Sequence, residues 1–193
     1  MLTSDKVDNG FDISVWSRLA HSGSTNAFAG FSKMINQEIT IRGISLEEVL
    51  PRNATSLIGG ADDQVIAVYL SFNGDTSGHI MLAFHPDIAY ELVDMIMGQP
   101  KGSTNNIGEL ERSAIGEVGN VVGAFFLNTI ADSAGQRLLP SPPQVSVDTV
   151  RSIMNSAMSD IFQQNKPLFG IKLSFSTPGH EIEGRFLVMP GLG

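Results

Sequence analysis

Three polar residues in the second half of the chain have the types and spacing to do chemistry together: Ser113, Glu117 and Asn120. They lie four and three positions apart, and side chains at these spacings share one face of an α-helix. That face would present a hydroxyl, a carboxylate and a carboxamide in a row, which together can donate and accept hydrogen bonds. The simpler interpretation is a solvated helix face, and the spacing by itself favours that interpretation.

The helix that must hold these residues is predicted over Glu109 to Ser133. Asn106, three positions before Glu109, resembles a capping arrangement, and Gly135 can terminate the helix. The face opposite the polar row is apolar and should be buried; it consists of Ile115, Val118, Val122, Phe125 and Phe126. The row itself is lined by small residues that would leave the helix backbone accessible to a partner, namely Gly116, Gly123 and Ala124.

A longer pattern contains this row, because Ser113-x3-Glu117-x2-Asn120 is followed after 22 residues by Pro143. The pattern resembles the signature of the CheC, CheX and FliY phosphatases, which has Asp or Ser, then Glu, then Asn, then a distant Pro. The string Ser-Ala-Ile-Gly-Glu-Val-Gly-Asn-Val-Val-Gly-Ala around it is similar to that family. So is the segment Gly74-Asp75-Thr76-Ser77-Gly78, and the resemblance covers nearly the whole chain.

The resemblance implies a substrate, which is the aspartyl phosphate of a CheY-type chemotaxis response regulator. The receiver domain of that partner carries its own Mg²⁺ and a conserved lysine, so this chain would need no cofactor and no metal of its own. Such a phosphoryl transfer mainly requires a water held in line with the breaking bond. The resemblance implies that Asn120 positions this water and that Glu117 engages the partner's lysine. Ser113 would support the helix face, and Pro143 would shape the adjacent loop.

The first half of the chain contains a degenerate counterpart of the pattern. Aligning Thr25-Asn26-Ala27-Phe28-Ala29 with the family's first copy places Ser14, Arg18 and His21 at the three signature positions, with Ile44 in place of the proline. The serine is kept, but arginine replaces the acid and histidine replaces the carboxamide. We therefore expect one competent site. The alternative is that Arg18 and His21 form a new anion site.

Both halves of the chain show the same order of elements: a long helix, a short strand, a second helical stretch and a β-hairpin. The first half is predicted to contain a helix over Ile13 to Asn36, a strand over Glu38 to Ile44, a turn capped by Ser45 with Glu47 and Glu48 in it, a hairpin of Val65 to Phe72 and Gly78 to Phe84 turning at Asn73-Gly74, and a helix from Pro86 to Gly98. A loop over Gln99 to Gly108 joins the halves. After the long helix, the second half is predicted to contain a strand over Val145 to Val147, a helix capped by Asp148 that runs from Thr149 to Phe162, and a hairpin of Phe169 to Phe175 and Ile182 to Met189 turning at Pro178-Gly179.

Helices that alternate with antiparallel hairpins indicate an α/β or α+β fold. The resemblance adds a CheC-like pseudo-two-fold repeat, in which long helices pack on an antiparallel-rich sheet. We expect one domain over residues 1–193, made of halves that span about 11–98 and 107–190.

The composition excludes several classes of function. The net charge of −8 makes nucleic acids and anionic membranes poor partners. The chain has no cysteine, which excludes disulfides, thiol nucleophiles and cysteine metal sites. The four histidines (His21, His79, His85 and His180) are scattered, so we expect structural or exposed roles for them. No signal peptide is evident and no apolar run approaches the roughly 20 residues of a membrane span, so a soluble cytoplasmic protein is expected.

Two other functions stay open. One is a non-catalytic receiver-binding or flagellar-switch module of the same fold, like the FliM middle domain, which lacks the Glu and Asn pair. The end of the chain at Gly193 leaves no room for a further domain, and we expect a free-standing enzyme instead. The other is an adaptor that binds CheD. The oligomeric state is also open, because a hairpin could leave a sheet edge for a second copy.

Overall fold

The computed structural model describes residues 13–157, 159 and 168–190, and it describes side chains for residues 18–156, 159 and 170–189. The elements follow in the order α1 (Ile13–Ile35), β1 (Thr40–Val49), the 3-10 helix η1 (Pro51–Leu57), β2 (Gln64–Gly74), β3 (Gly78–Phe84), α2 (Pro86–Ile96), α3 (Glu109–Ala134), β4 (Leu138–Pro140), β5 (Gln144–Thr149), α4 (Val150–Ala157), β6 (Leu168–Thr177) and β7 (His180–Pro190).

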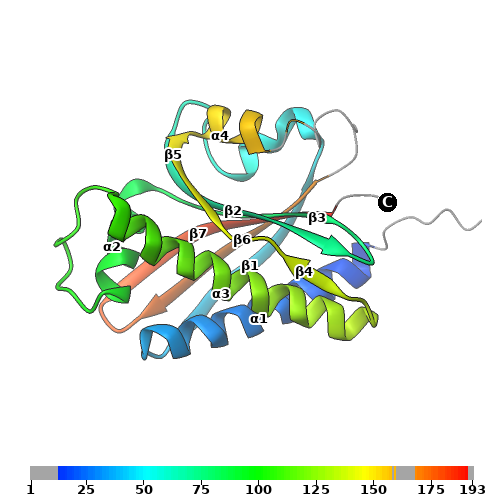
Figure 1. The fold of residues 1–193 in the computed structure, drawn as a ribbon, viewed down its shortest axis with the longest axis horizontal. Helices are drawn as coiled ribbons and strands as arrows, with labels where there is room; N and C mark the ends of the chain where they lie inside the picture. Colours follow the sequence, from blue (N-terminus) through cyan, green and yellow to red (C-terminus); the bar gives the residue numbers. More distant parts are fainter. Residues whose placement is uncertain (1–12, 158, 160–167, 191–193) are drawn as a thin grey trace, which may run out of the picture.

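The strands form one antiparallel sheet with α1, α2 and α3 on one face and η1 and α4 on the other (Figure 1). The strand order is β1-β6-β7-β3-β2-β4, and β5 also pairs with β2. Every pairing is antiparallel. The predicted fold class, long helices packed on an antiparallel sheet, is therefore confirmed.

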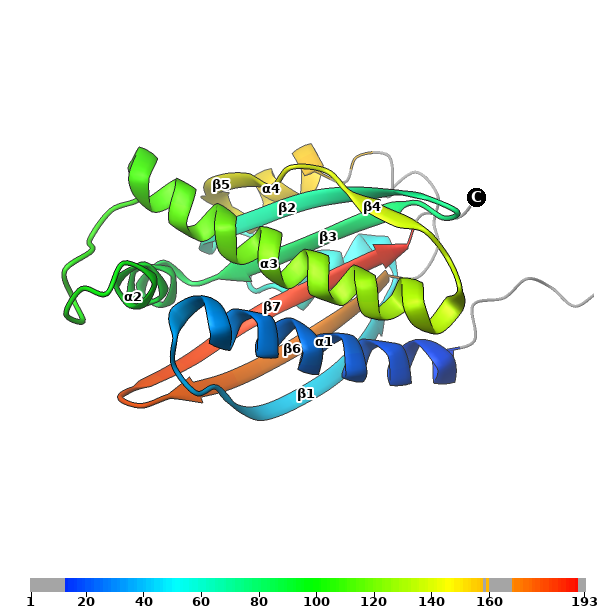
Figure 2. The same cartoon turned by 60° about the horizontal axis from the view of Figure 1, so that its bottom comes forward.

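The two sides of the sheet are built alike: each has an edge strand that leads into a short helix, followed inward by the two strands of a hairpin. One side gives β1-β6-β7 and the other gives β5-β2-β3. β1 leads into η1 and β5 leads into α4, while α1 and α3 run antiparallel, side by side across one face (Figure 2). This order fits the predicted halves 11–98 and 107–190, although the division itself stays a prediction.

The core lies on both faces of the sheet because side chains of a strand alternate between its faces. In β2, Ile66, Val68, Leu70 and Phe72 pack beneath the helices. Val65 and Ala67 belong to a smaller cluster beneath η1 and α4. β2 is thus buried on both sides, and its helix-facing row forms the floor on which α3 rests.

Strand β1 is longer than predicted, and the turn capped by Ser45 is wrong. Ser45, Glu47 and Glu48 all lie within β1. The alternation of Ile44 with Leu46 continues because both pair with buried residues of β6. The strand ends only before Pro51, which starts η1.

The first hairpin also turns later than the sequence predicts. Asn73 and Gly74 belong to β2, and the turn follows at residues 75–77. β2 extends because β4, which the sequence did not predict, pairs with Phe72, Asn73 and Gly74. The turn of the last hairpin at Pro178-Gly179 is confirmed, since Thr177 pairs with His180.

Two predicted helix caps differ from the structure. Gly108, not Asn106, precedes the first turn of α3, and its N–H donates to Glu111 Oε2 at 2.9 Å. At α4 the Ser152 N–H donates to Thr149 Oγ1 at 3.2 Å, so Thr149 is the cap and Asp148 lies in β5. The predicted end of this helix at Phe162 lies outside the described residues.

Helix α3 is long and apolar enough to cross a membrane by length and composition, contrary to the expectation of no such segment. Half of its most apolar window is buried inside the protein. A core helix meets the same criteria, because burial also selects apolar residues. No other helix in the described part of the chain meets them.

Candidate functional site

Helix α3 lies very close to the sheet because glycines face β2. A β-carbon on Gly119 would lie 2.3 Å from Val68 Cγ1, and one on Gly123 would lie 2.7 Å from Leu70 Cδ2. Ile115, Val118, Val122 and Phe126 are buried along the same side. The prediction that Gly116 and Gly123 leave backbone accessible to a partner is therefore wrong: both are buried, and Gly123 lets the helix approach the sheet.

Helix α1 holds the flank of α3. Asn26 Nδ2 donates to Thr129 Oγ1 at 3.0 Å. A β-carbon on Gly30 would lie 2.5 Å from the Phe125 ring, so this ring rests on the backbone of α1. Phe125 is nevertheless 40% exposed. Its predicted place on the buried face is wrong, because it lies toward the outer surface between the helices.

The polar row lies on the side of α3 that faces away from the sheet. Ser113, Glu117 and Asn120 are all exposed, and Ala124 is half-buried. Within the described part of the chain, none of the three polar side chains makes a hydrogen bond or ion pair. Glu117 is also the only charged residue of α3 between Ser113 and Ala131. A rigid helix thus presents a carboxylate and a carboxamide to solvent, one turn apart.

Pro143 lies beside this row, at the edge of the sheet. β4 ends opposite Phe72 and β5 begins opposite Tyr69. Between them Ser141 still bonds Ser71 of β2, with its N–H donating to the Ser71 carbonyl at 2.7 Å and its hydroxyl accepting from the Ser71 N–H at 3.0 Å, so Pro142 and Pro143 form the bulge. An edge bulge tolerates prolines because they have no N–H to pair. Gly119 and Gly123 cross β2 at Val68 and Leu70, so the bulge lies at the level of Asn120.

The segment Gly74-Asp75-Thr76-Ser77-Gly78 fixes the far end of α3. The Arg137 N–H donates to Asp75 Oδ2 at 2.8 Å, and the Asp75 N–H donates to the Arg137 carbonyl at 3.0 Å. Gly74 has φ +146°, and a β-carbon there would lie 1.9 Å from the Arg137 oxygen. The sequence showed this Gly-Asp pair as a family likeness but did not reveal its contact with Arg137.

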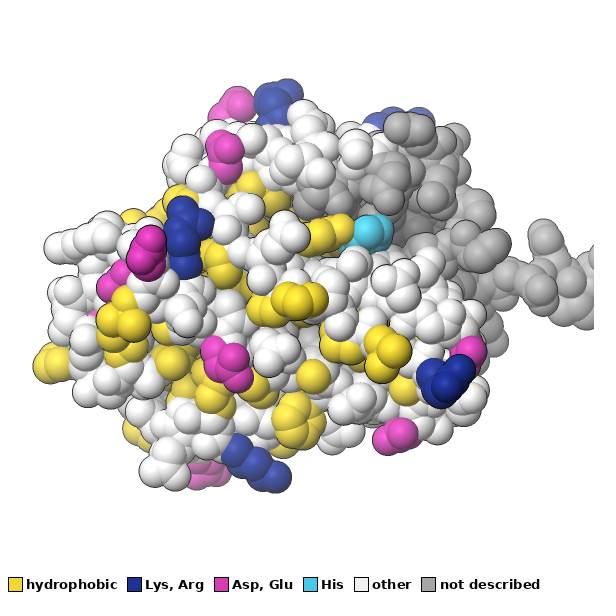
Figure 3. Space-filling model, in the orientation of Figure 1, with side chains coloured by type: hydrophobic (Ala, Val, Ile, Leu, Met, Phe, Trp, Pro, Cys, Tyr) yellow, Lys and Arg dark blue, Asp and Glu magenta, His cyan; other side chains and the backbone are white. Residues whose placement is uncertain are grey.

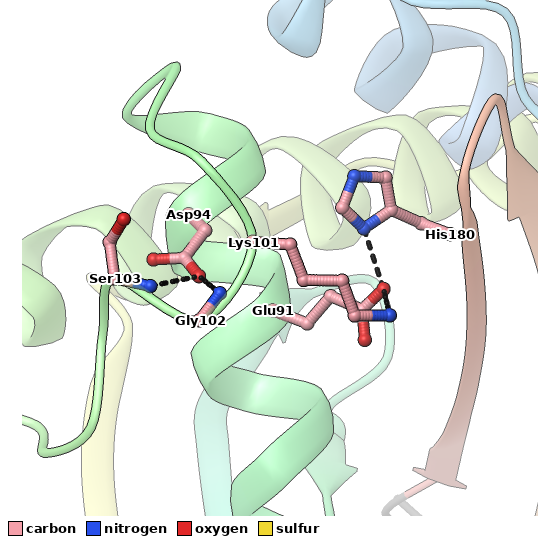
Figure 4. Close-up of polar contacts among 6 residues, drawn as sticks. All are labelled: Glu91, Asp94, Lys101, Gly102, Ser103 and His180. Atoms are coloured by element: carbon pink, nitrogen blue, oxygen red, sulfur yellow. Dashed lines mark hydrogen bonds and ion pairs between the residues drawn. The ribbon is translucent and has the colours of Figure 1, made fainter.

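The loop before α3 is fixed by two acids of α2 (Figure 4). Asp94 is fully buried and accepts hydrogen bonds from the N–H groups of Gly102, Ser103 and Thr104 at 2.7, 3.1 and 2.8 Å. Glu91 accepts from Lys101 Nζ at 2.8 Å and lies 2.5 Å from His180 Nδ1 in β7. The N-terminus of α3 is therefore tied to both α2 and the sheet.

Both acids are held as carboxylates. Burial would raise the pKa of Asp94, but hydrogen bonds from the Thr104 hydroxyl and from the three loop N–H groups outweigh burial and lower this pKa. Burial would likewise raise the pKa of Glu91, but Lys101 and His180 lower it below its usual value. This cluster could not be predicted from the sequence, since no local pattern links residues of α2, the loop and β7.

The degenerate row in the first half lies on α1. Arg18 and His21 are exposed, and Ile44 is half-buried in β1. Ser14 lies in the first turn of α1, but its side chain is outside the described residues. The alignment of the two rows also pairs Asn26 with Phe125 and Gly30 with Thr129. Under this alignment, the contact of Asn26 with Thr129 is equivalent to the contact of Phe125 with Gly30. Both contacts are present, which supports the alignment.

The histidines lie in separate places. His21 and His85 are exposed, and His85 Nδ1 is 3.6 Å from Asp87. His79 stacks on Tyr69 and hydrogen-bonds its hydroxyl. In the described part of the chain, no group of three or more His, Cys, Asp or Glu side chains could hold a metal ion.

Comparison with known proteins finds similarity to the CheC-like family. A model of the CheC-like family matches residues 110–147, the segment that contains Ser113, Glu117, Asn120 and Pro143. The CheY-P phosphatase CheC of Bacillus subtilis (strain 168) is 22% identical over 177 residues, which cover 87% of this chain and 82% of that protein. The resemblance predicted from the sequence is confirmed.

Solved structures share the fold. Thermotoga maritima FliY has a TM-score of 0.71 at 16% identity, covering 86% of this chain and 84% of that one. A CheX-CheY-BeF3-Mg+2 complex from Borrelia burgdorferi gives 0.57 at 13%, with 90% and 98% covered. The FliM middle domain from Vibro alginolyticus gives 0.60 at 12%, with 89% and 90% covered. The fold is therefore shared with FliY, with CheX and with the FliM middle domain.

Proposed function

We propose that this CheC-like chain is a cytoplasmic phosphatase that hydrolyses the aspartyl phosphate of a CheY-type response regulator. The observation that carries the proposal is the pair Glu117 and Asn120, exposed one turn apart on a helix that is fixed on its other sides. The pair lies within the segment that matches the CheC-like family. The relative named CheY-P phosphatase and the CheX structure solved with CheY add support.

Asn120 acts on the attacking water. Its carboxamide oxygen accepts a hydrogen bond from the water while its NH₂ group donates one toward the phosphoryl oxygens. The water oxygen then bonds to phosphorus as the phosphorus–oxygen bond to the receiver aspartate breaks, which yields inorganic phosphate and a free carboxylate. The chain contributes position more than covalent chemistry, which suits a loose phosphoryl transition state.

Glu117 holds the partner in register. Its carboxylate forms no ion pair or hydrogen bond within the described residues, so it is available to a cation of the receiver. A charge-assisted hydrogen bond to a lysine would fix the distance from Asn120 to the phosphate. Ser113 and Pro143 support the row and take no part in bond breaking. The Mg²⁺ that neutralises the phosphate belongs to the receiver.

The first half contributes no second active site. Arg18 places a cation where the receiver lysine would require an anion, and like charges oppose docking. His21 replaces the carboxamide. With one competent site per chain, we expect each chain to bind one receiver at saturation.

The test is the decay of a phosphorylated chemotaxis receiver, measured with wild-type chain, Asn120→Ala and His21→Ala. We expect acceleration by wild type and by His21→Ala, and none by Asn120→Ala. If wild type binds the phosphorylated receiver but leaves its lifetime unchanged, the chain is instead a binding module. The likeness to the FliM middle domain favours that second candidate. CheD binding is a separate proposal, to be tested by titration with CheD.

A further inference from the structure

The large exposed hydrophobic side chains are unevenly distributed. Among the described residues they are Leu50, Leu110, Phe125, Leu139 and Val147. Leu110 and Phe125 belong to α3, and Leu110 is 61% exposed. Figure 3 shows hydrophobic side chains on this face of the molecule, spread around an acidic side chain near the middle. Isolated exposed hydrophobic residues are ordinary, but a group around one functional row is not.

Three of these exposed side chains, Leu110, Phe125 and Val147, lie on the helix-bearing face with Glu117, together with the half-buried Val121. Leu110 lies two turns before it on α3, Val121 lies one turn after it, and Phe125 follows one turn later. Val147 lies on β5, two residues after Val145, which faces Gly116 of α3, and is 42% exposed. It pairs with Ile66, whose side chain packs beneath the helices, so Val147 points to the same face of the sheet as α3. We call Leu110, Val121, Phe125 and Val147 the apolar rim.

The first half of the chain shows that the fold does not require this rim. The alignment that pairs His21 with Asn120 and Ile44 with Pro143 gives the counterparts of three rim residues. Ser22 corresponds to Val121, Asn26 to Phe125 and Glu48 to Val147, and all three counterparts are exposed. The counterpart of Leu110 is Phe11, which lies outside the described residues. Three of the four equivalent places are therefore polar beside the degenerate row and apolar beside Glu117 and Asn120, while the fourth, Phe11 and its counterpart, is apolar in both halves.

We propose that the apolar rim is the docking surface for the receiver domain and sets the affinity for it. This inference rests on the proposed function and adds the contacts that bind the partner. The charge pattern identifies the occupant: one carboxylate, Glu117, stands within an otherwise uncharged stretch of α3 from Ser113 to Ala131. Such a surface fits a partner that presents a single cation, the receiver lysine, inside an apolar surround. Apolar anchors around a polar centre are typical of binding hot spots.

The experiment uses the double variant Val121→Ser/Val147→Thr. Both positions have an exposed side, and Ser already stands at the counterpart of Val121. Phe125 is left unchanged because its ring packs on Gly30. The matched control is Ser22→Ala/Glu48→Thr, which changes the equivalent positions of the first half. The measurements are the dissociation constant for a beryllofluoride-activated receiver, and KM and kcat for its phosphorylated form.

We expect the double variant to bind the receiver about tenfold or more weakly and to raise KM by a similar factor, with kcat retained. The control should match wild type. Unchanged affinity in the double variant, with wild-type catalysis intact, would overturn the rim while leaving the phosphatase standing. Weakened binding without any catalysis by wild type would support the rim and overturn the phosphatase. No binding of a phosphorylated receiver by wild type would overturn both. Self-association that the double variant abolishes, with receiver affinity unchanged, would overturn the rim as the receiver's docking surface and leave the phosphatase standing.

Discussion

Gly119 of α3 lies directly over Val68 of β2, so close that a β-carbon on Gly119 would be 2.3 Å from Val68 Cγ1. Residue 120 follows immediately, so this contact sets how far the Asn120 backbone stands from the sheet. The opposite face of the helix can therefore present its polar row at a fixed height.

Gly119→Ala should destabilise the fold and reduce activity. The added methyl group must push α3 away from β2, and overpacking of this kind costs about 1–3 kcal/mol. The displacement also moves Asn120, so catalysis should fall further than the loss of folded protein explains. Urea unfolding and receiver-phosphate decay measure the two effects.

Gly116→Ala is the matched control for that variant. A β-carbon there would lie 3.6 Å from Val145 Cγ2, an ordinary contact. Alanine also favours the helix by up to about 1 kcal/mol relative to glycine. The control should be at least as stable as wild type. Equal destabilisation by both substitutions would contradict the role given to close approach at Gly119.

The turn before β3 should matter for stability through its contact with Arg137. Asp75→Ala removes the acceptor of the Arg137 N–H, and we expect a loss of about 1 kcal/mol. Gly74→Ala should cost more, because φ +146° disfavours a side chain and the Arg137 oxygen occupies its place. Thermal unfolding of the two variants, with Ser77→Ala beside them, gives the order. An Asp75→Ala variant more unstable than Gly74→Ala would contradict it.

Asp94 should make stability depend on pH in the acidic range. Its pKa is lowered in the folded state, so its contribution is fully present above the unfolded value of about 3.8 and is lost as the pH falls through the folded value. Asp94→Asn should therefore be less stable than wild type at neutral pH. The difference between the two should shrink below about pH 3.8. A difference that stays constant down to strongly acidic pH would show that the loop N–H groups do not depend on the charge.

Much of this fold could be predicted from local sequence patterns. The positions of α1, α2 and α3 follow from apolar periodicity, and proline and glycine mark the ends of α2 and α3. The return strand Gly78–Phe84 and the turn at Pro178-Gly179 follow from period-two alternation and turn residues. These features depend on neighbours in the chain, so local reasoning suffices.

The errors share a physical cause, which is contact between distant segments. Asn73-Gly74 is a good turn sequence, yet pairing with β4 draws it into β2. Ser45 suits a helix cap, yet β6 extends β1 through it. The buried glycines of α3 could not be told from accessible ones, because the distinction depends on Val68 and Leu70 of another element.

The candidate row itself could be located from the sequence because spacing on one helix fixes it. Its surroundings could not. Val147 lies on the same face of the sheet as α3 because β5 pairs with β2. Asp94 of α2 bonds the loop before α3 because the chain turns back on itself after α2. The contrast between polar residues beside the degenerate row and apolar residues beside Glu117 could be recognised only from the alignment of the halves together with the exposure of each side chain.

The most direct test of the account separates binding from chemistry at Asn120. One would measure the affinity of Asn120→Ala for a beryllofluoride-activated receiver, and the decay rate of the phosphorylated receiver at saturating concentrations of this variant. The account predicts affinity close to wild type and a decay rate reduced on the order of 10²-fold or more. A variant that retains the wild-type rate at saturation would contradict the role of Asn120 in positioning the water.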